Sequence, residues 1–310
     1  LHLQELLDLQ RRHGGSLLYE AACCASIPVI RNMEEYYDND LLESVEGIVN
    51  GSTNYILSKI SSTNSSYAEA LAEAQHLGYA ESDPSLDVEG HDAVYKLNLL
   101  LVHAFGIFVN PADIFRLGIN RIGPAEQAYA REKGYKIKLV ARAIKEGDTV
   151  QAYVMPEFIR PQNKLYNVDG VFNGVRLNSC FSDAQFFEGR GAGAHPTASA
   201  VISDISALSY NYAYEYKKLG THLLAAKEHE IYVEVFFRHA PANAVRIRRA
   251  FDEVHTTHQE QDVQYLTGVI SLGALRGLLD HDPSCSCILL QHKKNYVAMS
   301  VSHEQIAFID

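Results

Sequence analysis

Two long apolar segments separated by a short turn constrain the fold of this chain more than any other feature. They read YKIKLVARAI (135–144) and VQAYVMPEFI (150–159), and a Glu-Gly-Asp turn lies between them. Runs rich in Val, Ile, Tyr and Phe that are bounded by turn residues are typical of β-strands. We therefore predict that residues 135–180 are β-rich and that AQFFEG (184–189) forms a further strand.

The first hundred residues alternate between helical and strand-like patterns. The patterns predict strands at SLLYEAA and LESVEGIV, a helix at TNYILSKI that Ser52 or Thr53 caps, and a helix at AEALAEAQHL. Ser66 and Glu69 have the spacing of a capping box, and Gly78 stands where a helix commonly ends. The chain as a whole is predicted to have an α+β fold, in which helices cover one face of a mixed β-sheet.

The C-terminal part has a different pattern. Strand-like segments at 230–240, 263–271 and 284–290 alternate with helix-like segments at 243–255 and 272–280. This order predicts a small βαβ-type module. We expect two domains, residues 1–227 and residues 228–310.

Charge and hydropathy exclude several classes of partner. The chain has 310 residues and a net charge of −11, which argues against nucleic acid as a partner, since phosphate contacts need clustered Lys and Arg. No apolar run reaches the roughly 20 residues that cross a bilayer. We expect no targeting peptide. The five cysteines are an odd count that includes adjacent Cys23 and Cys24. These features predict reduced thiols and a cytoplasmic location.

Cys285 and Cys287 allow two interpretations. They could bind a metal, or they could both face the interior from one short buried strand. The spacing alone favours the buried strand, because no second pair of ligands accompanies them.

The stretch GYAESDPSLDVEGHDAVYK (78–96) places several acids before a single lysine, Lys96. Asp92 and Lys96 are four residues apart, so they share one face of a helix. They could form an exposed ion pair that contributes only a few tenths of a kcal/mol. Alternatively, the acids hold the lysine and a substrate ammonium group, and the lysine exchanges a proton with a substrate oxygen.

Two further segments each have a structural and a functional interpretation. GRGAGAHPTAS (189–199) follows a predicted strand and opens a helix, so it is either a tight turn or a site that presents backbone N–H groups to an anion. EAACCASIP (20–28) either packs small residues at a strand end or turns its carbonyl groups toward a cation, with Glu20 adding an oxygen.

Together, four blocks resemble the catalytic part of the homoserine dehydrogenase family, in the family's order and spacing over about residues 1–210. The blocks are YEAACCASIPVI, GIVNGSTNYIL, LAEAQHLGYAESDPSLDVEGHDAVYKL and GRGAGAHPTASAV. The resemblance implies NAD(P)-dependent interconversion of L-homoserine and L-aspartate 4-semialdehyde, in the biosynthesis of aspartate-family amino acids such as threonine and methionine.

The resemblance also implies a role for each matching residue. Lys96 corresponds to the catalytic lysine and Asp92 to the acid beside it. Glu81 and Asp87 match the acids that bind the amino end of homoserine, and Gly78 and Tyr79 line the same pocket. Gly191 and Gly193 match the segment of about 188–210 that returns to the cofactor. Glu20, with the carbonyl groups of Cys23, Ala25 and Ile27, matches a monovalent cation site, usually for sodium.

The resemblance begins after the family's N-terminal Rossmann domain, so we expect that the main NAD(P)-binding domain is absent from this chain. The alternative expectation is a non-catalytic fragment, or a regulatory or assembly part of a larger aspartate kinase–homoserine dehydrogenase polypeptide, which binds the amino acid but not NAD(P) by itself. The exposed sheet face predicts a homodimer. The C-terminal module resembles a diverged ACT-like domain, with an amino acid such as threonine as its effector.

Overall fold

The structure is a computed structural model that describes residues 2–37, 41–260 and 263–296. Its helices are α1 Leu3–His13, α2 Val29–Glu35, α3 Gly51–Thr63, α4 Tyr67–His76, α5 Ser85–Val88, α6 His91–Phe105, α7 Pro124–Lys133, α8 Ala194–Leu208, α9 Ala244–Ala250 and α10 Leu272–His281. Its strands are β1 Leu42–Ile48, β2 Phe115–Arg116, β3 Lys136–Glu146, β4 Thr149–Ile159, β5 Phe172–Ser179, β6 Ala184–Arg190, β7 Leu224–Ala225, β8 Tyr232–His239, β9 Glu253–Glu260, β10 Val263–Ser271 and β11 Ser286–His292.

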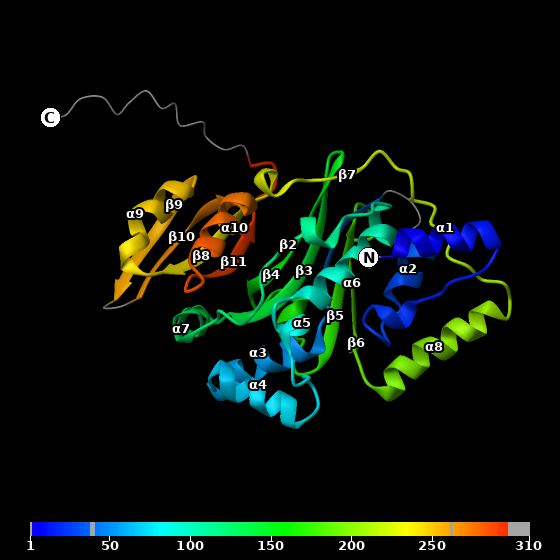
Figure 1. Ribbon diagram of the computed structural model, residues 1–310, viewed down its shortest axis with the longest axis horizontal. Helices are drawn as coiled ribbons and strands as arrows, with labels where there is room; N and C mark the ends of the chain where they lie inside the picture. Colours follow the sequence, from blue (N-terminus) through cyan, green and yellow to red (C-terminus); the bar gives the residue numbers. More distant parts are fainter. Residues whose placement is uncertain (1, 38–40, 261–262, 297–310) are drawn as a thin grey trace.

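One mixed sheet runs through the described part of the chain in the order β6-β5-β1-β3-β4-β11-β8-β10-β9. The neighbours along this path are antiparallel except β4 and β11, and the short strands β2 and β7 also pair with β4 in parallel. The sheet is therefore continuous across the boundary expected near residue 227. Figure 1 shows the C-terminal elements at one end of the molecule and α1, α2 and α8 at the other.

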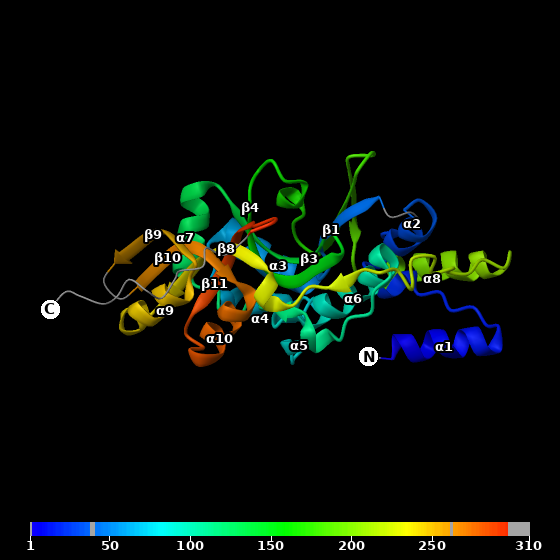
Figure 2. The same cartoon turned by 90° about the horizontal axis from the view of Figure 1, so that it is seen from above.

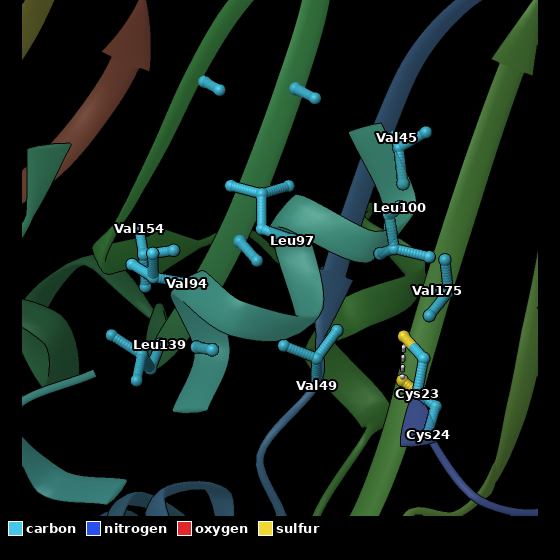
Figure 3. Packing of buried hydrophobic residues seen from close by; sticks show 14 of the residues in the cluster. Cys23, Cys24, Val45, Val49, Val94, Leu97, Leu100, Leu139, Val154 and Val175 are labelled. Atoms are coloured by element: carbon cyan, nitrogen blue, oxygen red, sulfur yellow. Dashed lines mark hydrogen bonds between the residues drawn. The ribbon is translucent and has the colours of Figure 1, made fainter. Parts of the chain in front are cut away.

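Helices α3 and α6 cover one face of β1, β3, β4 and β5, as the view from above shows (Figure 2). Figure 3 shows how apolar side chains of α6 lie among those of the strands. The residues in this contact include Val94, Leu97 and Leu100 of α6 with Val45, Leu139, Val154 and Val175 of the sheet. The predicted α+β fold, with helices covering one face of a mixed sheet, is confirmed.

Several local predictions are also confirmed. The β-rich segment forms the antiparallel pair β3–β4, which runs in register from Lys136 opposite Ile159 to Glu146 opposite Thr149. Ser66 caps α4 in a capping box with Glu69, and Gly78 follows that helix with φ +73°. Left-handed backbone of this kind is favourable for glycine, which has no Cβ.

One predicted strand and one predicted helix cap near the N-terminus were wrong, whereas the predicted helix at TNYILSKI is present as α3. Residues 16–22 form no strand: they run as irregular chain into a short 3₁₀ helix, Glu20–Ala22. The backbone N–H of Glu20 donates to the Asp204 side chain (3.0 Å), so a side chain and not a neighbouring strand satisfies it. Helix α3 is capped by Asn50, not by Ser52 or Thr53, and begins at Gly51.

The C-terminal module contains one strand that the sequence pattern missed. The predicted helix over 243–255 ends at Ala250, and β9 begins at Glu253 and pairs with β10. The order β8-α9-β9-β10-α10-β11 is the βαββαβ arrangement of ferredoxin-like modules. Residues 297–310, the last part of the expected second domain, lie outside the described residues.

Cys285 and Cys287 are buried in a core cluster together with residues of β8 and α10. Within the described residues, no group of three or more His, Cys, Asp and Glu side chains is arranged to hold a metal ion. These observations favour the buried-strand interpretation of the two thiols. No helix in the described ranges is both long and apolar enough to cross a membrane.

Candidate functional site

The predicted lysine and its neighbouring acid form a direct ion pair at the start of α6. Lys96 Nζ lies 2.8 Å from Asp92 Oδ2 and donates a second hydrogen bond to the Val49 carbonyl at 2.9 Å. The lysine side chain is 18% exposed and the Asp92 side chain 31% exposed. The pair is thus partly buried, unlike the solvent-exposed pair that the spacing alone allows.

A residue that the sequence analysis did not assign to the site, Asn50, connects the acids of this cluster. Asn50 Nδ2 lies 2.7 Å from Asp87 Oδ1 and 2.8 Å from Asp92 Oδ2. The sequence does carry a signal for this residue: an asparagine directly before a predicted helix is a preferred N-cap residue. The structure therefore brings Asp87, Asp92 and Lys96 together around one buried amide.

The electrostatic environment keeps Lys96 positively charged. Burial opposes the charge, but the Asp92 carboxylate and the nearby Cys23 and Cys24 thiols more than offset this, so the pKa of Lys96 is raised above its ordinary value. A charged lysine can donate a proton to a substrate oxygen and attract a negative charge that develops there.

The remaining predicted substrate residues lie on the exposed turn between α4 and α5. The Tyr79 carbonyl accepts a hydrogen bond from Ser52 Oγ at 2.6 Å, and the Tyr79 ring packs against Tyr55. Ser52, at the start of α3, was not predicted to belong to the site. Gly78 and Glu81 are exposed, and the Glu81 carbonyl accepts a hydrogen bond from Gln75.

The predicted cation loop follows the 3₁₀ helix at Glu20. Both oxygens of the buried Glu20 carboxylate accept backbone N–H groups at the start of α2, from Ile30 and Arg31, each at 2.9 Å. Cys24 and Ala25 have positive φ angles of 61° and 41°. This backbone conformation is unusual for residues other than glycine. It makes a sharp bend, which lets successive carbonyl groups point in different directions.

The predicted cofactor loop packs directly against this segment. Ser26 Oγ donates to the Arg190 carbonyl at 3.1 Å. Gly191 lies so close to Asn173 that an added Cβ would be 2.0 Å from the Asn173 amide nitrogen, and Gly193 has φ +116°. Both glycines therefore occupy positions that a side chain would disturb.

The thiols of Cys23 and Cys24 connect the cation loop with the lysine. Their sulfur atoms lie 4.0 Å apart, and Figure 3 shows the contact. The hydrogen bond from Cys23 and the positive charge of Lys96 both lower the pKa of Cys24, whereas the bond to Cys24 and burial raise the pKa of Cys23. The predicted cation, cofactor and lysine residues are therefore neighbours in space.

The buried carboxyl group of Glu20 predicts a dependence of stability on pH. Burial raises its pKa to about 7 from an ordinary value of 4.5. Because the folded-state pKa is raised, the stability that this group contributes is fully present below pH 4.5 and is lost as the pH rises through 7. Relative to Glu20→Gln, the wild type should lose about 3 kcal/mol of unfolding free energy over this window, since one pKa unit corresponds to about 1.4 kcal/mol.

Urea unfolding of both proteins in sodium-free buffer at several pH values measures this difference, because a cation bound at Glu20 would favour its carboxylate form. Glu69→Gln is the control, because the stability that Glu69 contributes should change with pH in the opposite direction. Hydrogen bonds from the Ser66 backbone and hydroxyl lower the pKa of Glu69. The stability that Glu69 contributes is present above its unfolded pKa and is lost as the pH falls. A difference between wild type and Glu20→Gln that does not change with pH would contradict the prediction.

The chain is similar to known proteins over most of its length. Residues 28–206 match the model of the homoserine dehydrogenase family. Homoserine dehydrogenase from Neisseria gonorrhoeae is 39% identical over 201 residues, which cover 65% of this chain and 46% of that protein. The Mycobacterium leprae enzyme is 43% identical over 206 residues, with coverages of 65% and 47%. The chain thus spans about half the length of these relatives.

Solved structures of homoserine dehydrogenases are also similar to this chain. A homoserine dehydrogenase from Thiobacillus denitrificans superposes with a TM-score of 0.81 at 27% identity, over 94% of this chain and 73% of that one. A hyperthermophilic archaeal homoserine dehydrogenase in complex with NADPH has a TM-score of 0.59 at 28% identity, over 69% of this chain and 61% of that one. The family model alone matches more than half of the residues, so this chain belongs to the homoserine dehydrogenase family.

Proposed function

We propose that this chain binds L-homoserine and L-aspartate 4-semialdehyde and moves the proton in their NAD(P)-dependent interconversion. The observation that carries the proposal is the Lys96–Asp92 ion pair, which Asn50 connects to Asp87. Bound NAD(P) supplies or accepts the hydride at the substrate carbon. The residues of this chain hold the substrate and exchange its proton.

The roles of the site residues follow from their charges and positions. Protonated Lys96 donates to the aldehyde oxygen during reduction, and neutral Lys96 accepts the hydroxyl proton during oxidation. Asp92 holds the lysine, while Asp87 and the exposed Glu81 bind the substrate ammonium group. Gly78 and Tyr79 form the wall of the pocket beside Ser52.

The cofactor residues present in this chain are Gly191 and Gly193. The left-handed backbone of Gly193, which has more open space around it, supports a loop that lets a ligand approach the backbone. Gly191 supports the shape of this loop, because Asn173 packs where a side chain would stand. NADP is the form that we favour, because a relative with a similar structure is solved in complex with NADPH.

A monovalent cation, sodium by preference, would be held by the carbonyl oxygens of Cys23, Ala25 and Ile27 together with Glu20. The left-handed residues Cys24 and Ala25 support this, because they bend the backbone as such a ring of carbonyls requires. Replacing sodium with tetramethylammonium should lower the thermal stability, since a bound ion stabilises only the folded state.

Isothermal titration tests the proposal most directly. L-homoserine should bind this chain, and Asp87→Asn should weaken the binding by removing a charge opposite the ammonium group. Absence of homoserine binding would contradict the proposal.

The second candidate function is that of a non-catalytic fragment, or of a part of a larger aspartate kinase–homoserine dehydrogenase polypeptide. Such a chain binds the amino acid but not NAD(P). The match to only about half of each relative favours it, and NADPH titration separates the two functions.

The raised pKa of Lys96 predicts how the reaction depends on pH. Homoserine oxidation needs the neutral lysine, so its rate should increase with pH toward the pKa of Lys96. Asp92→Asn removes the charge that raises this pKa, so the oxidation profile should move to lower pH. The measurement is kcat against pH in both directions in the encoded full-length polypeptide. An unchanged profile would show that Lys96 is not the titrating group.

We also propose a homodimer that forms through the sheet face opposite α3 and α6. This face has an open groove lined by polar residues of β1, β3 and β5, including Ser44, Arg142 and Asn178. Sedimentation equilibrium would test the dimer.

The βαββαβ order supports an ACT-like regulatory role for the C-terminal module, with an amino acid such as threonine as effector. Added threonine should then change turnover. The cysteines form no disulfide with one another in the described structure, which supports a cytoplasmic location.

A further inference from the structure

Asn50 stands at the junction between β1 and α3, and it uses both ends of its amide. Its side-chain oxygen accepts hydrogen bonds from the Thr53 backbone N–H and the Thr53 hydroxyl, each at 2.9 Å. Its backbone is extended (φ −126°, ψ 116°), and the residue is 5% exposed. The capping bonds therefore fix the plane of the amide before any other contact is considered.

The amide nitrogen of Asn50 points to the acidic cluster. Its two N–H groups reach Asp87 of α5 and Asp92 of α6, at 2.7 and 2.8 Å. An amide nitrogen has two donors, and here each one has a different carboxylate. A neutral donor between two carboxylates binds both of them without neutralising either charge.

The same Asp92 oxygen that accepts from Asn50 is the oxygen nearest to Lys96. The residue before Asn50, Val49, accepts the other hydrogen bond of the lysine through its carbonyl. Residues 49 and 50 thus hold the lysine twice, once directly and once through Asp92. The capped start of α3 fixes the position of both contacts.

We propose that Asn50 is a positioning residue, which orients Asp87 toward the substrate ammonium group and Asp92 toward Lys96. This inference rests on the proposed function of the site. In this inference one residue, Asn50, aligns the substrate-binding Asp87 with the proton-transfer pair of Asp92 and Lys96. Asn50 itself exchanges no proton in this assignment.

Asn50→Asp tests the proposal with little disturbance of the fold. Aspartate has nearly the same shape and is an equally good cap for Thr53, but it offers a third carboxylate where Asp87 and Asp92 need a donor. We expect the variant to fold and to lose about 10- to 100-fold in kcat, because small misplacements of catalytic groups cost rates of this order. The added negative charge should also move the homoserine-oxidation profile to higher pH.

The matched control is Ser66→Ala, which removes the N-cap of α4, whereas the lysine lies on α6. It should lower stability and leave kcat and the pH profile unchanged. Asn50→Ala loses both the cap and the donors, so it should combine the two effects.

A measurement without substrate separates this inference from the proposed function. In an NMR titration of labelled lysine side chains, Asn50→Asp should move the Lys96 titration to higher pH, whereas Ser66→Ala should not. If the wild type does not bind homoserine but this shift occurs, the proposed function fails, and Asn50 keeps only the role of orienting Asp92 toward Lys96. If the Lys96 titration and the pH profile of Asn50→Asp both match the wild type, the positioning role is wrong.

Discussion

Lys96→Ala is expected to reduce kcat by about 10²- to 10⁴-fold, the range that general acid–base catalysis typically contributes. The lysine is charged, partly buried and held by Asp92 and the Val49 carbonyl, so its ammonium group has a fixed place in the site. Its removal takes no group away from the cofactor loop, so NADPH affinity should change little. Steady-state kinetics and NADPH titration of the encoded full-length polypeptide measure the two quantities.

Two variants make this result specific. Lys96→Arg keeps a positive charge beside Asp92 but cannot release a proton at accessible pH, so it should be nearly as inactive in homoserine oxidation. Lys59→Ala removes a lysine of another ion pair, with Glu73 on the surface of α3 and α4, and should retain wild-type kcat. If Lys96→Ala keeps more than about a tenth of kcat, the lysine is not the proton carrier.

The sequence predicts those parts of the fold that depend on neighbouring residues. The β3–β4 pair follows from two apolar runs and a turn, and the α4 capping box follows from Ser66 and Glu69 alone. Each of these elements has a local cause, either a strand pattern or a cap within one helical turn. The predicted ion pair of Asp92 and Lys96 is of the same kind, because four residues separate them on one helix.

The errors occur where distant residues decide the structure. The segment 16–22 has the composition of a strand, but its backbone is fixed by Asp204, more than 180 positions later. The helical pattern over 243–255 continues past Ala250, yet pairing with β10 makes β9 a strand. Tertiary contacts override local propensity in both cases.

The candidate site was predicted only in part for the same reason. The motif identifies Asp87, Asp92 and Lys96, but it gives no sign that one amide connects them. Asn50 lies 37 and 42 positions before the two acids, and the contact exists only because β1 ends beside the start of α6. A single sequence does not reveal such a pairing.

Arg142→Met is expected to destabilise the protein by about 3 kcal/mol or more, because removal of one partner from a buried ion pair leaves the other charge uncompensated. Arg142 lies 2.7 Å from both Glu46 Oε2 and Glu157 Oε2, on the sheet face opposite α3 and α6. The side chains of Glu46 and Glu157 are only 4% and 5% exposed. Urea unfolding of the variant and the wild type measures the difference.

The pKa of Glu157 determines how this loss depends on pH. Burial raises the pKa of Glu157 even with Arg142 present, so the stability that this group contributes is lost as the pH rises through the raised value. Without Arg142 the pKa rises further, because the nearby positive charge that favours the carboxylate is gone. The deficit of Arg142→Met should therefore be smaller in acid than at neutral pH.

Arg176→Met is the matched control, since Arg176 also binds Glu46 at 2.7 Å but is 33% exposed. It should cost about 1 kcal/mol or less, as partly exposed ion pairs do. The double variant Arg142→Met with Glu157→Leu removes the unpaired acid and leaves Glu46 bound to Arg176, so it should recover much of the lost stability. If Arg142→Met and Arg176→Met cost the same, burial does not decide the strength of this network, and the sheet face tolerates unpaired charge as a solvent-exposed surface does.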